Sequence, residues 1–298
     1  MTLKNDGKEP LVFDDDPLDD VLYAKSPADP TPADCFLPIK NHMRKVREAS
    51  QAHDNAALLS ALTVISKENM ALHQPICDEI IDITEALIPN IPLPSLTYDI
   101  VSLTPLLERI WALPGTPHGY KRRRAVGDRL YRCYEHQRRY ADARQILHRL
   151  IQITQERGER TGEAVYTNNF AFEYLLEKRW KDAMPLFQRA EKLFFDEGDD
   201  FQGANSQANF MTCIFSLRPA CELTEHEPEL RDLAHALSKD NDWRARKPLN
   251  LLSQIRESQG NIDGAIQFMQ CALSASEGDN LRWSEIDQAR LAELETKK

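Results

Sequence analysis

Two helical patterns of apolar residues stand back to back between Glu163 and Gly198. The first pattern places Val165, Phe170 and Tyr174 on one face, and the small Ala171 beside Phe170 is expected to let the helices approach closely. In the second, apolar residues recur every three or four positions, as one face of an α-helix requires; they are Trp180, Ala183, Phe187, Ala190 and Phe194. Only the short polar stretch 177–179 separates the two patterns, so the sequence predicts an antiparallel helical hairpin.

The second helical pattern recurs along the chain. Residues 140–143 (Y-A-D-A) match residues 180–183 (W-K-D-A) and 262–265 (I-D-G-A). From Ala143 to Ala183 is 40 residues, and from Ala183 to Ala265 is 82, or twice 41. We expect the skipped copy between Asn205 and about Lys239, with an irregular corner where two prolines, Pro219 and Pro228, interrupt it. Because one hairpin cannot bury its apolar face alone, the recurrence predicts an all-α stack of hairpins.

Two runs in the best-defined hairpin resemble a known family. The N-N-F-A-x-x-Y run at 168–174 and the W-x-x-A-x-P-L-F-x-R-A run at 180–190 are similar to a tetratricopeptide hairpin, in particular the longer variety found in kinesin light chains. The resemblance covers roughly residues 119–278. It implies a right-handed superhelical solenoid with capping helices at both ends. It also implies a non-catalytic scaffold or adaptor whose concave groove holds a protein or peptide partner. The alternative is a regulatory sensor, in which a small molecule or signalling peptide alters the shape of the solenoid.

The chain divides into four parts by composition and pattern. Residues 1–38 are acidic and rich in proline, which predicts a disordered tail, although an apolar segment from Leu11 to Tyr23 leaves open a motif that folds onto a partner or onto this protein. Residues 39–112 carry helical stripes and are expected to form a helical N-terminal cap or, alternatively, a separate small domain. The repeats then occupy 119–280, and 281–298 form a capping helix. The cap's stripes include Leu58, Leu62, Ile65, Leu103, Leu106, Leu107 and Ile110.

Composition and motifs narrow the function classes. The net charge of −10 argues against a dedicated nucleic-acid binder. No apolar run has the roughly 20 residues that span a bilayer, and no signal peptide is visible, so we expect a cytoplasmic protein without a membrane partner. The six cysteines form no C-x-x-C pair and are expected to be reduced thiols. Nucleotide-binding, hydrolase and metalloprotease signatures are missing, so we expect no enzyme, no cofactor and no metal site.

One polar position recurs on the first helix of each predicted hairpin. Alignment on the three alanines places Asp128, Asn168, Asn209 and Asn250 at equivalent positions, and in the tetratricopeptide fold this position faces the groove. An amide offers both a donor and an acceptor, so such a row suits the backbone of an extended peptide. The expected groove also includes Arg132, Phe172, Lys247 and Gln254. The alternative is that the amides bond within or between adjacent helices. If they bind a partner, Asn168→Ala with Asn209→Ala should weaken binding and lower the melting temperature little.

The charge is unevenly distributed. Residues 119–160 contain twelve Lys or Arg against five acids, whereas residues 1–40 contain nine acids against four bases. The basic stretch begins with a patch formed by Lys121, Arg122, Arg123 and Arg124. This asymmetry suggests that the acidic tail docks on the basic repeat and competes with a partner. The alternative is that both are solvated faces, since exposed charge pairs contribute little.

Overall fold

The computed structural model describes residues 32–52, 55–67, 79–80, 101, 103–112, 120–238, 243–276 and 281–298. Within these ranges every regular element is a helix. The chain forms two compact units, residues 1–133 and residues 134–298, which we call the N-terminal and C-terminal units. None of the described helices combines the length and the apolar character needed to cross a membrane.

The N-terminal unit contains α2 (Pro32–Gln51), α3 (Asn55–Lys67), α6 (Thr104–Ala112) and most of α7 (Tyr120–His136), with α3 packed against α2 and α6. The expected stripes on α3 and α6 are buried, which confirms them. The start of α2 at Pro32 lies inside the segment 1–38 that we expected to be tail, so seven residues of that segment are helical. The rest of that tail, residues 1–31, and the expected loop at 113–119 lie outside the described residues.

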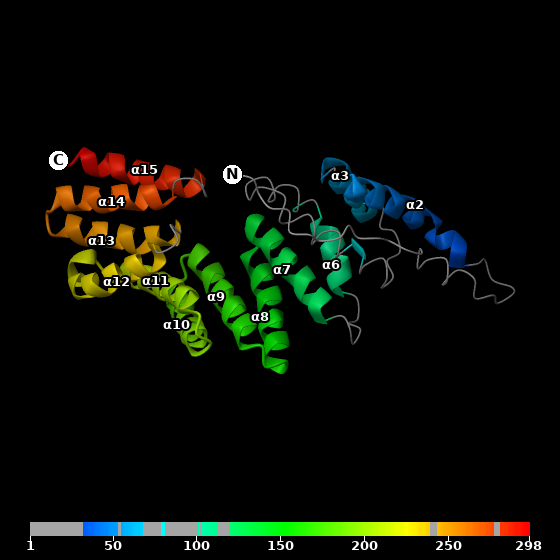
Figure 1. Cartoon of the computed structure of the whole chain (residues 1–298), viewed down its shortest axis with the longest axis horizontal. Helices are drawn as coiled ribbons and strands as arrows, with labels where there is room; N and C mark the ends of the chain where they lie inside the picture. Colours follow the sequence, from blue (N-terminus) through cyan, green and yellow to red (C-terminus); the bar gives the residue numbers. More distant parts are fainter. Residues whose placement is uncertain are drawn as a thin grey trace. The chain divides into compact units, whose positions relative to one another are not determined.

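The C-terminal unit is a succession of helices in which each packs on the next (Figure 1). In addition, α11 contacts both α9 and α13. The helices are α8 (Tyr140–Glu156), α9 (Arg160–Leu176), α10 (Trp180–Asp196), α11 (Asp200–Leu217), α12 (Glu227–Ser238), α13 (Arg246–Ser258), α14 (Ile262–Ser276) and α15 (Leu281–Glu295). Two short 3₁₀ turns, Ala220–Glu222 and Thr224–His226, separate α11 from α12, which confirms the irregular corner after Pro219.

The two helices of the best-defined hairpin bury their side chains differently. On α10 four of the five expected residues, Ala183, Phe187, Ala190 and Phe194, are at most 1% exposed, and the fifth, Trp180, is partly buried. On α9 the expected large residues Val165, Phe170 and Tyr174 are only partly buried, and Val165 and Tyr174 pack against buried clusters. Small side chains are buried instead, among them Ala164, Thr167 and Ala171. Packing of α9 against both α8 and α10 explains this, since small residues allow two neighbours to approach at once.

Left-handed backbone conformations mark the ends of the helices at regular intervals. Arg138 and Lys178 both have φ of 59°, and Gly260 has φ of 75°, each in the turn between the two helices of a hairpin. In the second turn the Lys178 N–H donates to Leu175 C=O at 2.9 Å, and the next N–H donates to Tyr174 C=O at 2.9 Å. This pair of bonds closes a helix through a left-handed residue. The three positions differ by 40 and 82, the same intervals as the three alanines, so the backbone repeats with the sequence.

Candidate functional site: a polar row across the first helices

Side chains from α9, α11 and α13 form one hydrogen-bonded row, which we call the polar row. Ser206 Oγ and Asn209 Nδ2 of α11 both donate to Asn168 Oδ1 of α9, at 3.1 and 3.4 Å. From α13, Lys247 Nζ donates to Asn209 Oδ1 at 2.6 Å and to Asn205 Oδ1 at 3.1 Å. The structure therefore brings together three of the expected groove residues, Asn168, Asn209 and Lys247, and adds Asn205 and Ser206.

A second network joins α13 to α15. Arg246 Nε and Nη2 donate to the two carboxylate oxygens of Asp287 at 2.8 and 2.7 Å, and Asn250 Nδ2 donates to Asp287 Oδ1 at 3.1 Å. The Arg246 and Asp287 side chains are 8% and 2% exposed. Two parallel charge-assisted bonds give this buried pair both strength and a defined geometry. Asn250, expected in the groove, is thus held by a residue that sequence reasoning missed.

These bonds follow the register of the sequence. Asn209 bonds a residue 41 positions earlier, and Arg246 bonds a residue 41 positions later. Steps of 41 from Asn205 reach Arg246 and then Asp287. Consequently α15, which we expected only as a cap, occupies the register of a first helix. This interval of 41 was visible in the sequence one helical turn before the aligned positions Asn209 and Asn250, which we call, with Asn168, the asparagine ladder. The alignment of the asparagines alone did not test the earlier positions.

The asparagines of the ladder differ in what they leave unbonded. Asn209 is 2% exposed and bonded on both sides, so for this residue the alternative of bonds between adjacent helices holds. Asn168 and Asn250 are half-buried. Among the described residues, Asn168 Nδ2 and Asn250 Oδ1 have no hydrogen-bond partner. These two half-buried asparagines therefore keep one unused amide donor, on Asn168, and one unused amide acceptor, on Asn250.

The other expected groove residues lie on the same helices or in the other unit. Phe172 of α9 is half-buried and packs in a cluster with the buried thiol of Cys213, and Gln254 of α13 is also half-buried. Asp128 and Arg132 lie on α7 in the N-terminal unit, where the Arg132 guanidinium is 5.5 Å from the Tyr131 ring centroid. The ladder as observed therefore consists of the members on α9, α11 and α13.

A cluster of cations and aromatic rings adjoins the polar row at the start of α13. The Arg244 guanidinium lies 5.4 Å from the Phe201 ring centroid and 5.3 Å from that of Trp243. The Lys247 ammonium lies 5.7 Å from the same Trp243 ring. Such contacts hold a cation in place by the negative face of the ring. Lys247 is thereby positioned both by amide oxygens and by an aromatic face.

The basic stretch is partly neutralised where the structure describes it. Arg139 pairs with Asp142 at 2.6 Å, Arg144 pairs with Glu177, and Arg160 pairs with two acids at the end of α10. Of the expected patch at 121–124, the first two side chains lie outside the described residues, and Arg123 stacks over Trp111 at 4.9 Å. The charge excess seen in the sequence is therefore smaller on the surface than a residue count implies.

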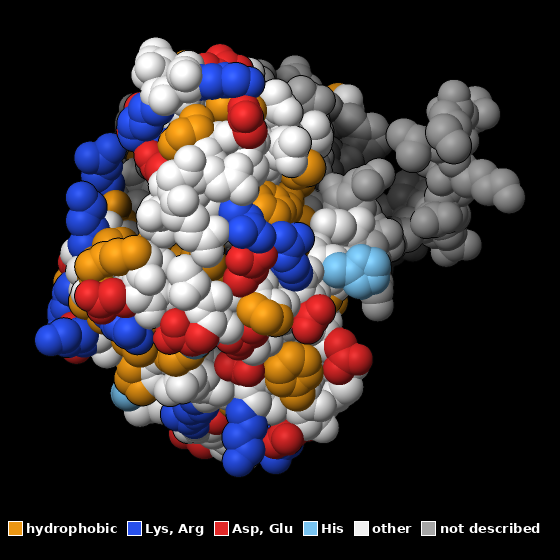
Figure 2. All heavy atoms as spheres, turned by 90° about the vertical axis from the view of Figure 1, so that its left-hand side faces the viewer, with side chains coloured by type: hydrophobic (Ala, Val, Ile, Leu, Met, Phe, Trp, Pro, Cys, Tyr) orange, Lys and Arg blue, Asp and Glu red, His pale blue; other side chains and the backbone are white. Residues whose placement is uncertain are grey.

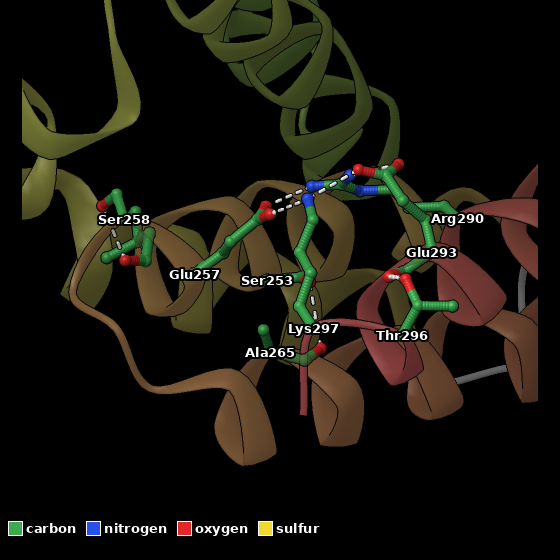
Figure 3. Close-up of polar contacts among 9 residues, drawn as sticks. Ser253, Glu257, Ser258, Ala265, Arg290, Glu293, Thr296 and Lys297 are labelled. Atoms are coloured by element: carbon green, nitrogen blue, oxygen red, sulfur yellow. Dashed lines mark hydrogen bonds and ion pairs between the residues drawn. The ribbon is translucent and has the colours of Figure 1, made fainter.

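Ion pairs also tie the last helix to α13 (Figure 3). Glu257 of α13 pairs with Arg290 and with Lys297 Nζ, the latter at 2.7 Å. Glu293 accepts from the same two cations, and their hydrogen bonds, Arg290 first, lower the pKa of Glu293 to about 2. The face on this side of the molecule mixes basic and acidic side chains (Figure 2). These charges therefore hold α15 in place and do not form a surface of one sign.

A buried carboxylate stands apart from these networks. Glu173 of α9 is 1% exposed, and its Oε2 has no hydrogen-bond partner. Burial raises the pKa of Glu173 to about 8, with Glu135 and Glu177 raising it further and Arg144 opposing them. Steps of 41 residues along the sequence from Glu173 reach Ile214 and then Ile255. A carboxyl group thus occupies a place that other repeats fill with an apolar side chain.

Buried thiols and candidate ligand sites complete the description. Burial raises the pKa of Cys133 to about 11 and that of Cys213 to about 12, and the described cysteines are all free. In the described ranges no group of three or more His, Cys, Asp and Glu side chains is arranged to hold a metal ion. An open depression of about 460 Å³ lies between α2 and α3, lined mainly by small residues such as Ala49, Ala57 and Ala61. No protein-family model and no curated protein matches the chain.

Proposed function

We propose that this chain is a non-catalytic adaptor, a tetratricopeptide-like solenoid that binds a protein or an extended peptide along its first helices. Helical hairpins whose alanines, turn residues and inter-helix hydrogen bonds recur every 40 or 41 residues support the repeat architecture. Stacked hairpins of this kind build continuous surfaces that suit extended partners.

The observation that carries the proposal is the unequal bonding of the polar row. Its central residue, Asn209, donates a hydrogen bond to one neighbouring helix and accepts one from the other, which holds the helices at a set spacing. Asn168 Nδ2 and Asn250 Oδ1 remain for a ligand, one as a donor and one as an acceptor. An extended peptide offers both complementary groups along its backbone at every residue. Phe172 and Gln254 add an apolar and a polar contact on the same helices.

Peptide selection from a random displayed library, with the full chain as bait, tests this mode of binding. Affinities of the selected peptides are then measured by fluorescence anisotropy. Loss of one hydrogen bond costs about 1 kcal/mol, so Asn168→Ala and Asn250→Ala should each weaken binding about fivefold. Lys192→Ala, at an exposed position on α10, is the matched control and should leave the affinity unchanged.

Two results would contradict the proposal. One is a library that yields no peptide binding to the full chain at micromolar concentration. The other is a set of peptides whose affinity is the same for Asn168→Ala, Asn250→Ala and the unmodified chain. Thermal melts of each variant, followed by circular dichroism, separate a loss of binding from a loss of folding.

A further inference from the structure

The buried carboxyl of Glu173 lies at the end of α9 that is farthest from the connection between α9 and α8. Residues 157–159 join the two helices, and so short a connection makes them antiparallel neighbours. Next to this turn the helices pack closely, because a Cβ atom added to Gly162 would lie 2.9 Å from Cγ2 of Thr154. The contact between α8 and α9 is therefore tight beside the turn, and Glu173 lies at its opposite end.

At this opposite end, three carboxyl groups and one cation form a cluster. Arg144, near the start of α8, pairs with Glu177, which follows the last residue of α9. Arg144 also acts electrostatically on Glu173, and so do Glu135 and Glu177. Glu135 is at the end of α7 and within the C-terminal unit. We call these four residues the acid cluster; it contains more acidic groups than basic ones.

Helices α10 and α11 also pack against α9. The side chains that they contribute to the hydrophobic cluster at this part of α9 include Phe187 and the buried Cys213, and burial raises the pKa of Cys213 to about 12, so its thiol stays protonated. Arg179, in the turn before α10, lies 3.9 Å from Glu177 and so stabilises that carboxylate. Within the described residues, Glu173 Oε2 has no hydrogen-bond partner. A negative charge on Glu173 would therefore depend on the arginine of α8 that Glu177 already engages.

The positions one and two repeats after Glu173 carry Ile214 and Ile255, and Ile255 is completely buried. An apolar side chain stabilises a packed contact at every pH, whereas a carboxyl group does so only while it is protonated, because burial disfavours its charged form. Burial raises the pKa of Glu173 to about 8, and the pKa returns to about 4.5 when the carboxyl group reaches water. The contact between α8 and α9 is therefore strongest below pH 4.5 and weakens as pH rises from there through 8.

We propose that the acid cluster is a proton-dependent switch, in which loss of the Glu173 proton separates the start of α8 from the end of α9. The turn at 157–159 is the hinge of this movement, because the two helices are joined there and pack closely beside it. The contacts among α10 to α15 include no member of the acid cluster and stay closed. The inference does not depend on the polar row, because it concerns the packing of α8 and requires no ligand.

Native-state amide hydrogen exchange of the full chain, read by mass spectrometry at pH 6 and pH 8.5 in low concentrations of urea, tests this switch. After correction for the intrinsic exchange rate, amides at the start of α8 should exchange about 10- to 100-fold faster at pH 8.5, because ionisation favours the open form. Their exchange should depend on urea much less than that of amides in α13, because a local opening exposes less surface than global unfolding does. Glu173→Gln should abolish the increase with pH, and so should Glu173→Ile, which introduces the residue found one repeat later.

A matched substitution distinguishes the acid cluster from another partly buried acid. Glu191 of α10 is half-buried, and burial and the charge of Glu229 raise its pKa, so Glu191→Gln removes a comparable acid and should leave the increase at α8 unchanged. The proposal would be overturned by α8 amides whose urea dependence equals that of α13, or by exchange that does not increase with pH. It would also be overturned by an increase that persists in both Glu173 variants, or that Glu191→Gln abolishes equally. The measurement uses no peptide, so this proposal and the proposed function fail independently.

Discussion

Glu173→Gln is expected to stabilise the protein in a pH-dependent way. The carboxyl group is buried, one of its oxygens has no hydrogen bond, and burial raises its pKa from 4.5 to about 8. The charged groups that act on it are Glu135 from α7, Arg144 from α8 and Glu177 from its own helix. Glutamine has the shape of the protonated acid and cannot ionise, so it removes the cost of a buried negative charge.

The sign and size follow from the shift in pKa. Because the folded-state pKa of Glu173 is raised, the folded protein binds its proton more tightly than the unfolded chain does. The stability that this proton contributes is complete below pH 4.5 and is lost as pH rises towards 8. One pKa unit corresponds to about 1.4 kcal/mol, so the loss is about 3 kcal/mol at pH 7 and about 5 kcal/mol above pH 8.

Urea denaturation of both proteins, followed by circular dichroism between pH 5 and pH 9, measures this effect. Glu173→Gln and the unmodified chain should have nearly equal free energies of unfolding at pH 5 and should diverge by several kcal/mol at pH 9. Glu156→Gln, at an exposed position on α8, is the matched control and should give a pH profile parallel to that of the unmodified chain. Parallel profiles for Glu173→Gln as well would refute the reasoning.

Three further predictions concern single sites. Asp287→Ala leaves Arg246 buried without its carboxylate, which should cost about 3–5 kcal/mol and increase amide hydrogen exchange in α15 above that in α10; unchanged exchange in α15 would contradict this role. Lys178→Gly relieves a left-handed conformation and should raise the free energy of unfolding by about 1 kcal/mol, whereas Lys181→Gly, inside α10, should lower it by about the same amount. Alkylation of the native protein, read by mass spectrometry, should modify the exposed thiols well before the buried ones, whose raised pKa and burial oppose reaction, and equal rates would argue against the described burial. Among the cysteines that the structure describes, the exposed thiols are Cys221 and Cys271, and the buried ones are Cys133 and Cys213.

The sequence predicted best those features that depend on a single contact face. Helix α10 packs one side of its surface into the core, so its apolar stripe appears directly as a spacing of three and four residues. Helix α9 packs against several neighbours, and its buried residues are mostly small and spread around the helix, among them Ala164, Thr167 and Ala171. A search for one apolar face therefore selected the large residues at its margins and, of the small ones at its contacts, only Ala171.

The sequence predicted the interval at which polar contacts recur between helices, but it did not predict every residue that makes them. The interval of 41 correctly placed Asn209 against Asn168, because residues one repeat apart lie on adjacent first helices. The same interval leads from Arg246 to Asp287, yet the ladder of asparagines directed attention away from it. No pattern in the sequence near Glu173 predicts that its carboxylate is buried, since its burial results from how α8 and α9 pack against each other.

The bonding of the polar row decides which substitutions can separate binding from folding. Asn209→Ala would remove an amide that is 2% exposed and is one of the partners of both Lys247 and Asn168, which are half-buried, and an unsatisfied buried polar group costs about 1–3 kcal/mol. The paired substitution Asn168→Ala with Asn209→Ala should therefore lower the melting temperature, contrary to the expectation from sequence, and a loss of binding in that variant would be ambiguous. Asn250→Ala retains the buried Arg246–Asp287 pair, so its effect on a peptide reports the ligand contact more directly. Asn168→Ala removes the acceptor of the buried Ser206 and Asn209 side chains, so Asn250 is the position at which a partner can be detected with the least disturbance of its site.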